Sequence, residues 1–454
     1  MVDDTIKGLN PQQANAVQTV DGPMLILAGA GSGKTKVLTC RIAHLLNQGV
    51  RPYRILAITF TNKAAAEMRE RVDKMAGEAA KDVWLHTFHA FCAKLLRIEI
   101  HHLGQYTNNF AIYDTTDTKS LMKQILQEMN LDEKRYQPSA VIGRISNAKN
   151  QLQTPEDYAK QASDFYDGKV AEIYARYEAK LQQNNALDFD DLLLLTLKLL
   201  QENEEVRTKY QDKFDYIMVD EYQDTNHAQY LLTKILAAKH KNICVVGDAD
   251  QSIYGWRGAD ITNILDFEKD YPEAKLVKLE QNYRSTQVIL DAANAVIDNN
   301  TGRKPKNLWT DNGNGNQITY FRAIDERDEA RFVIEQIQAL DSRPDVKLGD
   351  MAILYRTNTQ SRVFEEMLIK SGIGYNIVGG TKFYERKEIK DIIAYLRVIF
   401  NPNDSLSLLR IINVPRRGIG DATLAKLQAY AEENNMNLFD VVSASGDVPG
   451  LSSR

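Results

Sequence analysis

The segment that most constrains how this chain can fold is a glycine-rich stretch near its N-terminus. Residues 28–35 are AGAGSGKT; the apolar run 24–27 precedes them and the helical pattern 36–47 follows. Glycines let the backbone turn tightly and point N–H groups at phosphate oxygens, and the first turn of a helix adds the positive end of its dipole. Strand, glycine loop and helix in this order are the context of a phosphate-binding loop, so a chance glycine-rich turn is the weaker interpretation.

Each residue type in this loop has an expected task. Lys34 would neutralise the β- and γ-phosphates of a nucleotide, and the Thr35 hydroxyl would bind Mg²⁺. The motif begins with Ala28 where glycine is usual, and we expect the turn to tolerate this small residue. The predicted nucleotide contacts in the loop are Ala28, Gly29, Ala30, Gly31, Ser32, Gly33, Lys34 and Thr35.

The pattern along the chain predicts an α/β fold with a parallel sheet, because short apolar runs alternate with helical patterns. Between about 108 and 186 the periodicity is helical and no convincing strand is visible, so we expect a helical insertion that interrupts the sheet. The predicted strands of this sheet are 24–27, 55–59, 83–87, 216–219, 243–246 and 276–279.

A second α/β domain is predicted after a polar loop at 299–316. Its predicted strands are 318–321, 352–355 and 375–378, its predicted helices are 326–340 and 360–370, and from Lys387 onward the pattern is helical. No later run completes this second sheet, so we expect it to be incomplete. The predicted domains are 1–107 with 187–279 (first α/β domain), 108–186 (helical insertion), 280–386 (second α/β domain) and 387–454 (start of a second helical subdomain).

Two carboxylates follow a predicted strand in the segment 216–225, YIMVDEYQDT. Asp220 and Glu221 are thereby expected at the carboxyl edge of the sheet, where the phosphate loop also lies. Asp220 suits a second Mg²⁺ ligand, and Glu221 suits a base that orients the attacking water. Such a pair is often only a solvated strand end, but its combination with the phosphate loop favours the catalytic interpretation.

Two further segments carry polar and aromatic candidates. In 245–260, VVGDADQSIYGWRGAD, Gln251 would sense a γ-phosphate, whereas Tyr254, Trp256 and Arg257 would form a base-stacking platform. Core packing of the two aromatic residues is the alternative.

The other segment is 279–286, LEQNYRST. Arg284 would reach the γ-phosphate as a finger, and Tyr283 would stack on adenine. An isolated Tyr-Arg pair would be interpreted as ordinary surface.

Composition excludes some classes of protein. Lys plus Arg is 56 and Asp plus Glu is 61, a net charge of −5, so the chain is not a histone-like basic protein, although a local groove for nucleic acid stays possible. The three cysteines lack zinc spacing. The polar N-terminus is no signal peptide and no apolar run approaches the length of a membrane span, so we expect a cytoplasmic protein without membrane contact.

Taken in order, AGAGSGKT, ITFTNKAAAEM, TFHAFC, LDFDDLL, DEYQDT, GDADQSIYGWRGAD and QNYRST resemble the UvrD/PcrA/Rep group of superfamily 1A DNA helicases, with the PcrA branch as the nearest match. The resemblance implies RecA-like domains of the P-loop NTPase class, with the second incomplete here. It implies ATP-driven 3′ to 5′ stepping on single-stranded DNA and duplex unwinding, in DNA repair or replication. ATP, Mg²⁺, single-stranded DNA, single-strand/duplex junctions and repair or replication proteins are the implied ligands and partners.

The resemblance also implies residue roles. Gln13 matches an adenine-contacting glutamine, although it also suits the capping box of a helix that starts near Asn10. Lys36 stands where many relatives carry an arginine that packs on adenine, which changes the expected base pocket. The acids of LDFDDLL, at 188, 190 and 191, match a family motif but equally suit a helix cap. The implied DNA-contacting residues are Phe60, Thr61, Asn62, Thr87, Phe88, His89, Tyr254, Trp256, Arg257, Tyr355 and Arg356.

Two late family motifs, including one with a second arginine finger, are not found before Arg454, so we expect an N-terminal portion only. The alternative function is then a nucleotide- and DNA-binding fragment that does not unwind. A P-loop kinase or transferase is disfavoured by DEYQDT and QNYRST, and a helicase–nuclease fusion would need a nuclease domain that this sequence lacks.

Overall fold

The computed structural model describes residues 4–300, 302–378, 386–434 and 436–451. The chain divides into two compact units, Met1–Asn314 with Asp391–Arg454, and Gly315–Lys390. In the described part, no helix combines the length and the apolar character that crossing a membrane requires.

A six-stranded sheet forms the centre of the larger unit, with strand order β3-β2-β6-β7-β1-β8 and every pairing parallel. The strands are β1 (Met24–Ala28), β2 (Ile55–Thr59), β3 (Trp84–Thr87), β6 (Tyr216–Val219), β7 (Ile243–Gly247) and β8 (Lys275–Leu279). Each predicted strand of this sheet is confirmed to within one residue at either end. Because the strands are parallel, the loops that follow them share one edge.

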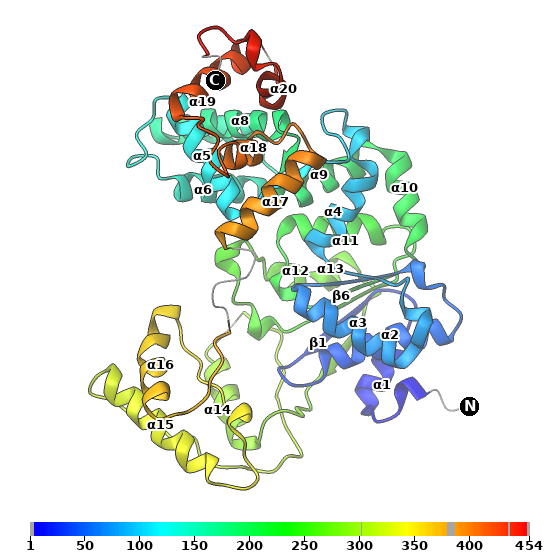
Figure 1. The fold of residues 1–454 in the computed structure, drawn as a ribbon. Helices are drawn as coiled ribbons and strands as arrows, with labels where there is room; N and C mark the ends of the chain where they lie inside the picture. Colours follow the sequence, from blue (N-terminus) through cyan, green and yellow to red (C-terminus); the bar gives the residue numbers. More distant parts are fainter. Residues whose placement is uncertain (1–3, 301, 379–385, 435, 452–454) are drawn as a thin grey trace. The chain divides into compact units, whose positions relative to one another are not determined.

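Helices cover both faces of this sheet (Figure 1), which explains why its central strands are apolar without alternation. Leu25 and Leu27 of β1 pack into one core, whereas Met24 and Ile26 pack into the other. The first core includes α4 (Phe88–Glu99), α9 (Phe189–Glu202), α10 (Glu204–Lys213) and α11 (His227–Ala237), and the second includes α1 (Pro11–Gln18), α2 (Lys34–Asn47) and α3 (Asn62–Ala76).

A helical segment with its own core interrupts the chain between β3 and β6. It contains α5 (Thr115–Glu128), α6 (Pro138–Asn150), α7 (Pro155–Gln161) and α8 (Phe165–Gln183). A two-stranded ladder, β4 (Ala111–Ile112) with β5 (Ala186–Leu187), closes its base. The sequence did not reveal this ladder, because two residues per strand are too few to show a period of two.

Helices near the C-terminus of the chain pack against this segment through buried polar contacts. They are α17 (Lys387–Phe400), α18 (Ser405–Ile411), α19 (Asp421–Glu433) and α20 (Leu438–Ser443). Asn401 donates to the carbonyl of Asn184 at 3.0 Å, and the Tyr113 hydroxyl donates to Asp404 at 2.7 Å.

The smaller unit corrects the prediction of a second sheet. Its helices α15 (Glu326–Asp341) and α16 (Ser361–Lys370) form where expected, but the described residues of 318–321, 352–355 and 375–378 contain no strand. Leu354 is 90% exposed and Val378 is 93% exposed. A strand exists only where a neighbour completes its hydrogen-bond ladder, and an apolar run specifies no such neighbour. The described residues of the polar segment 299–316 form a loop as predicted, with one isolated bridge from Trp309 to Gln281.

Candidate functional site

The phosphate loop joins β1 to α2 at the carboxyl edge of the sheet. The Gly29 N–H donates to the Leu279 carbonyl at 3.0 Å, and the Ser32 hydroxyl donates to the Gly29 carbonyl at 2.7 Å. Gly33 precedes α2 with a φ of 87° and supplies no side-chain cap. The N–H groups in the first turn of α2 therefore stay available to an anion.

At two positions of this loop a side chain would be unfavourable, because close neighbours leave no room for a Cβ atom and because the φ angles are positive. A Cβ at Gly31 would lie 2.6 Å from Asn282 Nδ2 and 2.8 Å from Arg284 Cβ, and one at Gly33 would lie 2.8 Å from Gln13 Nε2. The tertiary structure thus brings the segment QNYRST against the phosphate loop. Asn282 Nδ2 donates to the Ala30 carbonyl at 2.6 Å.

Lys34 and Glu221 form an ion pair at this edge. Lys34 Nζ lies 2.9 Å from Glu221 Oε2, and Gln223 Nε2 donates to the same oxygen at 3.0 Å. The lysine side chain is 11% exposed and the glutamate side chain 35% exposed. Glu221 adopts a φ of 51°, an uncommon and strained conformation for a residue with a side chain.

Asp220 is buried beside this pair, and its Oδ1 accepts a hydrogen bond from the Glu221 N–H at 2.9 Å. Burial, and then the negative charge of Glu221, raise the pKa of Asp220 to about 6. Burial, and then Glu221, also raise the pKa of Asp224 to about 6. Three carboxylates and one amide, those of Asp220, Glu221, Asp224 and Gln223, thus lie near Lys34 behind the phosphate loop.

Thr35 and Asp220 are the predicted Mg²⁺ ligands. Thr35 lies in the first turn of α2, and Asp220 follows β6. Among the described residues, no three His, Cys, Asp or Glu side chains gather as a metal site would require. One hydroxyl and one carboxylate suit Mg²⁺, which takes most of its oxygens from phosphates and water, so these residues fit the ion.

The predicted adenine contacts lie around α1. Gln13 is buried, and its capping box with Asn10 is confirmed, because Asn10 N donates to Gln13 Oε1 at 3.1 Å and Gln13 N donates to Asn10 Oδ1 at 2.8 Å. Gln13 Nε2 also donates to the Ser32 carbonyl at 2.8 Å. The exposed Tyr283 accepts from Asn10 Nδ2 at 2.9 Å, and Lys36 donates to the Gly8 carbonyl. Contact of these residues with adenine stays a prediction.

Gln251 follows β7, and its Nε2 donates to the buried Asp248. Lys306 also contacts Asp248, and Arg303 pairs with Asp250 at 3.1 Å. The sequence pattern predicts only a polar loop for Arg303 and Lys306. The sequence feature that could have indicated these contacts is the basic segment GRKPK, which pairs in the fold with the acidic segment GDAD.

Aromatic side chains gather near the ends of β2 and β7. The rings of Phe60 and Tyr254 stack at 5.5 Å with an interplanar angle of 28°, and Tyr254 and Trp256 are 6.4 Å apart. Trp256 is 73% exposed, so the alternative that it is a core residue is wrong. The side chain of Arg257 lies outside the described residues.

The other predicted DNA-contacting residues include helix-capping residues and one buried core residue. Thr61 and Thr87 cap α3 and α4, and the Thr87 hydroxyl lies 3.5 Å from Asn62 Oδ1. Phe88 is 2% exposed and belongs to the core, so its side chain does not lie on the surface, and its contact with DNA stays a prediction.

His89 lies next to this group, with its ring 5.5 Å from the ring of the exposed Phe189, a residue that was not among the predicted DNA contacts. Tyr355 is half-buried and Arg356 is exposed, and both belong to the smaller unit.

The acids of LDFDDLL form a buried network with Lys149. Asp188 caps α9 together with Asp191, which confirms the helix-cap interpretation. Lys149 Nζ lies 2.9 Å from Asp188, 2.6 Å from Asp191 and 2.7 Å from Glu178. Burial by itself lowers the pKa of Lys149, but these carboxylates hold it well above its usual range. Asp190 binds Asn150, which also accepts from Asn226 beside the DEYQDT segment.

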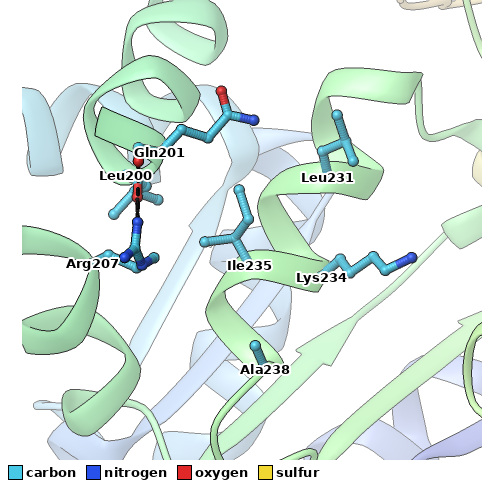
Figure 2. Close-up of a pocket in the computed structure, with 7 residues that line it drawn as sticks. All are labelled: Leu200, Gln201, Arg207, Leu231, Lys234, Ile235 and Ala238. Carbon is cyan, nitrogen blue, oxygen red and sulfur yellow. Dashed lines mark hydrogen bonds between the residues drawn. The ribbon is translucent and has the colours of Figure 1, made fainter. Parts of the chain in front are cut away.

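A groove of about 400 Å³ lies between α9, α10 and α11, away from the predicted site (Figure 2). It is lined by Leu200, Gln201, Arg207, Leu231, Lys234, Ile235 and Ala238. Arg207 is bound to the carbonyls of Leu200 and Gln201. None of the predicted site residues lines this groove, and its largely apolar walls do not suit a triphosphate.

Comparisons with known proteins bear on this site. A model described as the UvrD/REP helicase N-terminal domain matches residues 9–272, and a model described as the UvrD-like helicase C-terminal domain matches residues 277–447. The ATP-dependent DNA helicase PcrA of Staphylococcus epidermidis strain RP62A is 56% identical over 450 residues, 99% of this chain and 61% of that protein. The ATP-dependent DNA helicase PcrA of Staphylococcus aureus strain Mu50 is 56% identical over 447 residues, 98% of this chain and 61% of that protein.

The chain spans 61% of the length of these curated relatives. Because residues 277–447 match a C-terminal-domain model, the expectation of an N-terminal portion only is not borne out.

Proposed function

This chain belongs to the UvrD/REP helicase family, and on that premise we propose that it is an ATP-dependent DNA helicase. In this proposal, hydrolysis of ATP drives 3′ to 5′ stepping on single-stranded DNA and separation of the duplex ahead. The observation that carries the proposal is the contact of Lys34 Nζ with Glu221 Oε2, 2.9 Å apart, behind a glycine loop at the start of α2. A phosphate-binding cation and a base are thereby joined in one site.

The Lys34–Glu221 pair suggests how nucleotide binding prepares hydrolysis. Phosphate oxygens compete with Glu221 for the ammonium group of Lys34, and N–H groups at the start of α2 help to hold them. The Glu221 carboxylate is then released from Lys34 while Gln223 still holds one of its oxygens. A carboxylate freed in this way is a base that can accept the proton of an attacking water.

Thr35 and Asp220 are the residues that would hold Mg²⁺, which supplies positive charge to the phosphates when bound. In the absence of the ion, burial and the charge of Glu221 raise the pKa of Asp220 to about 6. Mg²⁺ binds the ionised carboxylate, so its binding should weaken as the pH falls through this value.

Arg284 is the proposed finger for the γ-phosphate. Its Cβ lies beside Gly31, its side chain is exposed, and in the described part of the chain its guanidinium has no ion-pair partner. Gln251 is the proposed γ-phosphate sensor, and Gln13, Lys36 and Tyr283 are the proposed contacts of the adenine.

The aromatic surface of Phe60, Tyr254 and Trp256 supports a single-stranded nucleic acid as the substrate. Bases stack on exposed aromatic rings whatever their sequence, so binding should be non-specific and salt-dependent. Thr61, Asn62, Thr87 and His89 lie at the ends of β2 and β3 and extend the proposed DNA contact, and Arg257, Tyr355 and Arg356 belong to the same proposal.

The predicted domain boundaries belong to this proposal as well, with a nucleotide-binding domain interrupted by the segment 108–186. DNA junctions are the proposed entry sites, and repair or replication proteins are the proposed partners. The proposed compartment is the cytoplasm, because the matched relatives are staphylococcal proteins and bacterial DNA lies in the cytoplasm.

The test is to measure ATP hydrolysis with and without single-stranded DNA, and unwinding of a duplex with a 3′ single-stranded tail, using the same preparation. DNA-stimulated hydrolysis with unwinding is the expected result. Hydrolysis or binding without unwinding would favour the second candidate, a nucleotide- and DNA-binding chain, which the lack of described strands at 318–321, 352–355 and 375–378 favours. Transfer of phosphate to an acceptor other than water would contradict both.

A further inference from the structure

A buried cluster of opposite charges lies beside the proposed site. Lys306 Nζ contacts Asp248 Oδ1 and lies 2.5 Å from Asp250 Oδ2, and Arg303 lies 3.1 Å from the same Asp250 oxygen. The Lys306 side chain is 5% exposed and that of Asp248 is 3% exposed. In the described part of the chain, Lys306 is the one cation that forms an ion pair with Asp248.

Asp248 connects this cluster to the residues proposed for catalysis. Its Oδ2 accepts from Gln251 Nε2, and its N–H donates to Gln223 Oε1 at 2.9 Å. The other end of the Gln223 amide donates to Glu221, which pairs with Lys34. An unbroken series of polar contacts therefore runs from Lys306 to the phosphate loop.

The charge of Asp248 needs Lys306 for a physical reason. A carboxylate removed from water is costly unless a cation and hydrogen bonds compensate it. Asp250 is a second carboxylate in the same cluster, and its Oδ1 is buried without a hydrogen-bond partner. Lys306 also bridges the two side chains by direct contact, so without it the side chain at position 248 would lose the anchor that fixes it against the amide of Gln251.

We propose that Lys306 is a positioning residue for ATP hydrolysis, which acts through Asp248 to fix Gln251 and Gln223 relative to the γ-phosphate. The inference rests on the proposed function. It assigns to the segment after α14 (Gln287–Ile297) a part in the site that the motifs of the sequence do not indicate.

The test compares Lys306→Met with Lys304→Met in DNA-stimulated hydrolysis. Lys304 is a matched control, because it lies two residues away and pairs with Glu268 outside this cluster. For Lys306→Met, we expect kcat to fall by about tenfold to a hundredfold, since small displacements of catalytic groups have effects of this size. We expect the KM for ATP to change by no more than about twofold, and Lys306→Arg to recover much of kcat.

A second variant keeps the test informative if Lys306→Met folds poorly. Lys306→Met/Asp248→Asn removes the uncompensated charge but leaves a carbonyl oxygen that can accept from Gln251. The proposal expects this variant to be stable and still slow. A stable variant with the kcat of the parent would show that Lys306 only compensates charge, and would overturn the positioning role.

A binding measurement separates the inference from the proposed function. We expect Lys306→Met to bind ADP as the parent does but to lose affinity for ADP with aluminium fluoride, which imitates the transferred phosphoryl group. Equal affinities of parent and variant for both ligands would overturn the inference alone. A parent chain that binds neither ligand would overturn the proposed function and the inference with it.

Discussion

Glu221→Gln should strengthen ATP binding while it stops hydrolysis. In the structure, Lys34 Nζ lies 2.9 Å from Glu221 Oε2, so the phosphates of a nucleotide must displace this carboxylate before they contact the lysine. Glutamine keeps the size and the hydrogen-bonding oxygen of the side chain but removes its charge. The substitution therefore frees Lys34 for the nucleotide and removes the base at the same time.

The size of the gain in affinity follows from the exposure of the pair. Lys34 is 11% exposed and Glu221 is 35% exposed, so water screens the pair only partly. Fully exposed ion pairs contribute about 0.2–1 kcal/mol, and hydrogen bonds to charged groups contribute about 1.5–3 kcal/mol. A value of about 1 kcal/mol is reasonable here and corresponds to about fivefold tighter ATP binding. The loss of a general base should slow hydrolysis by about 10²–10⁴-fold.

The assay is equilibrium binding of a fluorescent ATP analogue, followed by single-turnover hydrolysis. Glu67→Gln is the matched control, because it removes the same charge from an exposed pair with Arg71 on α3. Affinity that rises equally in both variants would reflect net charge alone. If Glu221→Gln loses affinity as steeply as it loses rate, Glu221 is a ligand of the nucleotide or its metal, and the argument that it competes for Lys34 fails.

Three further predictions follow from burial and exposure. Burial raises the pKa of Asp220 to about 6, above its ordinary 3.8, so the stability that the protonated carboxyl provides is fully present below the ordinary pKa and is lost as the pH rises through about 6. The free energy of unfolding of Asp220→Asn minus that of the parent should therefore rise by up to about 3 kcal/mol from pH 4 to pH 7. The measurement is a urea titration without nucleotide or Mg²⁺, and a flat difference would contradict the raised pKa. Trp256→Ala should lower single-stranded DNA affinity by about 1–3 kcal/mol in fluorescence anisotropy with little change in melting temperature, because the indole is 73% exposed; a variant of normal affinity would exclude stacking there. Lys149→Met should lower the free energy of unfolding by about 3–5 kcal/mol, because it leaves buried carboxylates without a cation; the exposed Lys160→Met should change it by about 0.2–1 kcal/mol, and equal effects of the two variants would be inconsistent with the buried network.

Local patterns of the sequence determined the larger sheet. Each of its six strands is a short apolar run that pattern alone delimits, and every pairing is parallel. Parallel strands bring the loops after them to one edge, so Lys34, Glu221 and Gln251 could be expected to lie near one another before any coordinates were known. The caps made by Gln13 and Asp188 were also visible, because a capping box involves residues only three positions apart.

Local sequence patterns gave wrong predictions where a strand needs a distant neighbour or where burial decides the role of a side chain. The apolar runs at 318–321, 352–355 and 375–378 predicted strands, yet the described residues there form no ladder, because a strand needs a neighbour that its own sequence does not specify. Phe88 and Trp256 are both aromatic residues within motifs, but only the packing of the fold buries the first and exposes the second.

The sequence by itself determined the type of fold and the residues that surround a nucleotide, because glycine conformation, strand period and helix caps act within a few positions. Only the tertiary structure decided which charges meet. Lys34 lies 187 positions from Glu221, and Lys306 lies 58 positions from Asp248. Contacts over such separations depend on the packing of the whole sheet and its loops, and no short-range periodicity encodes them.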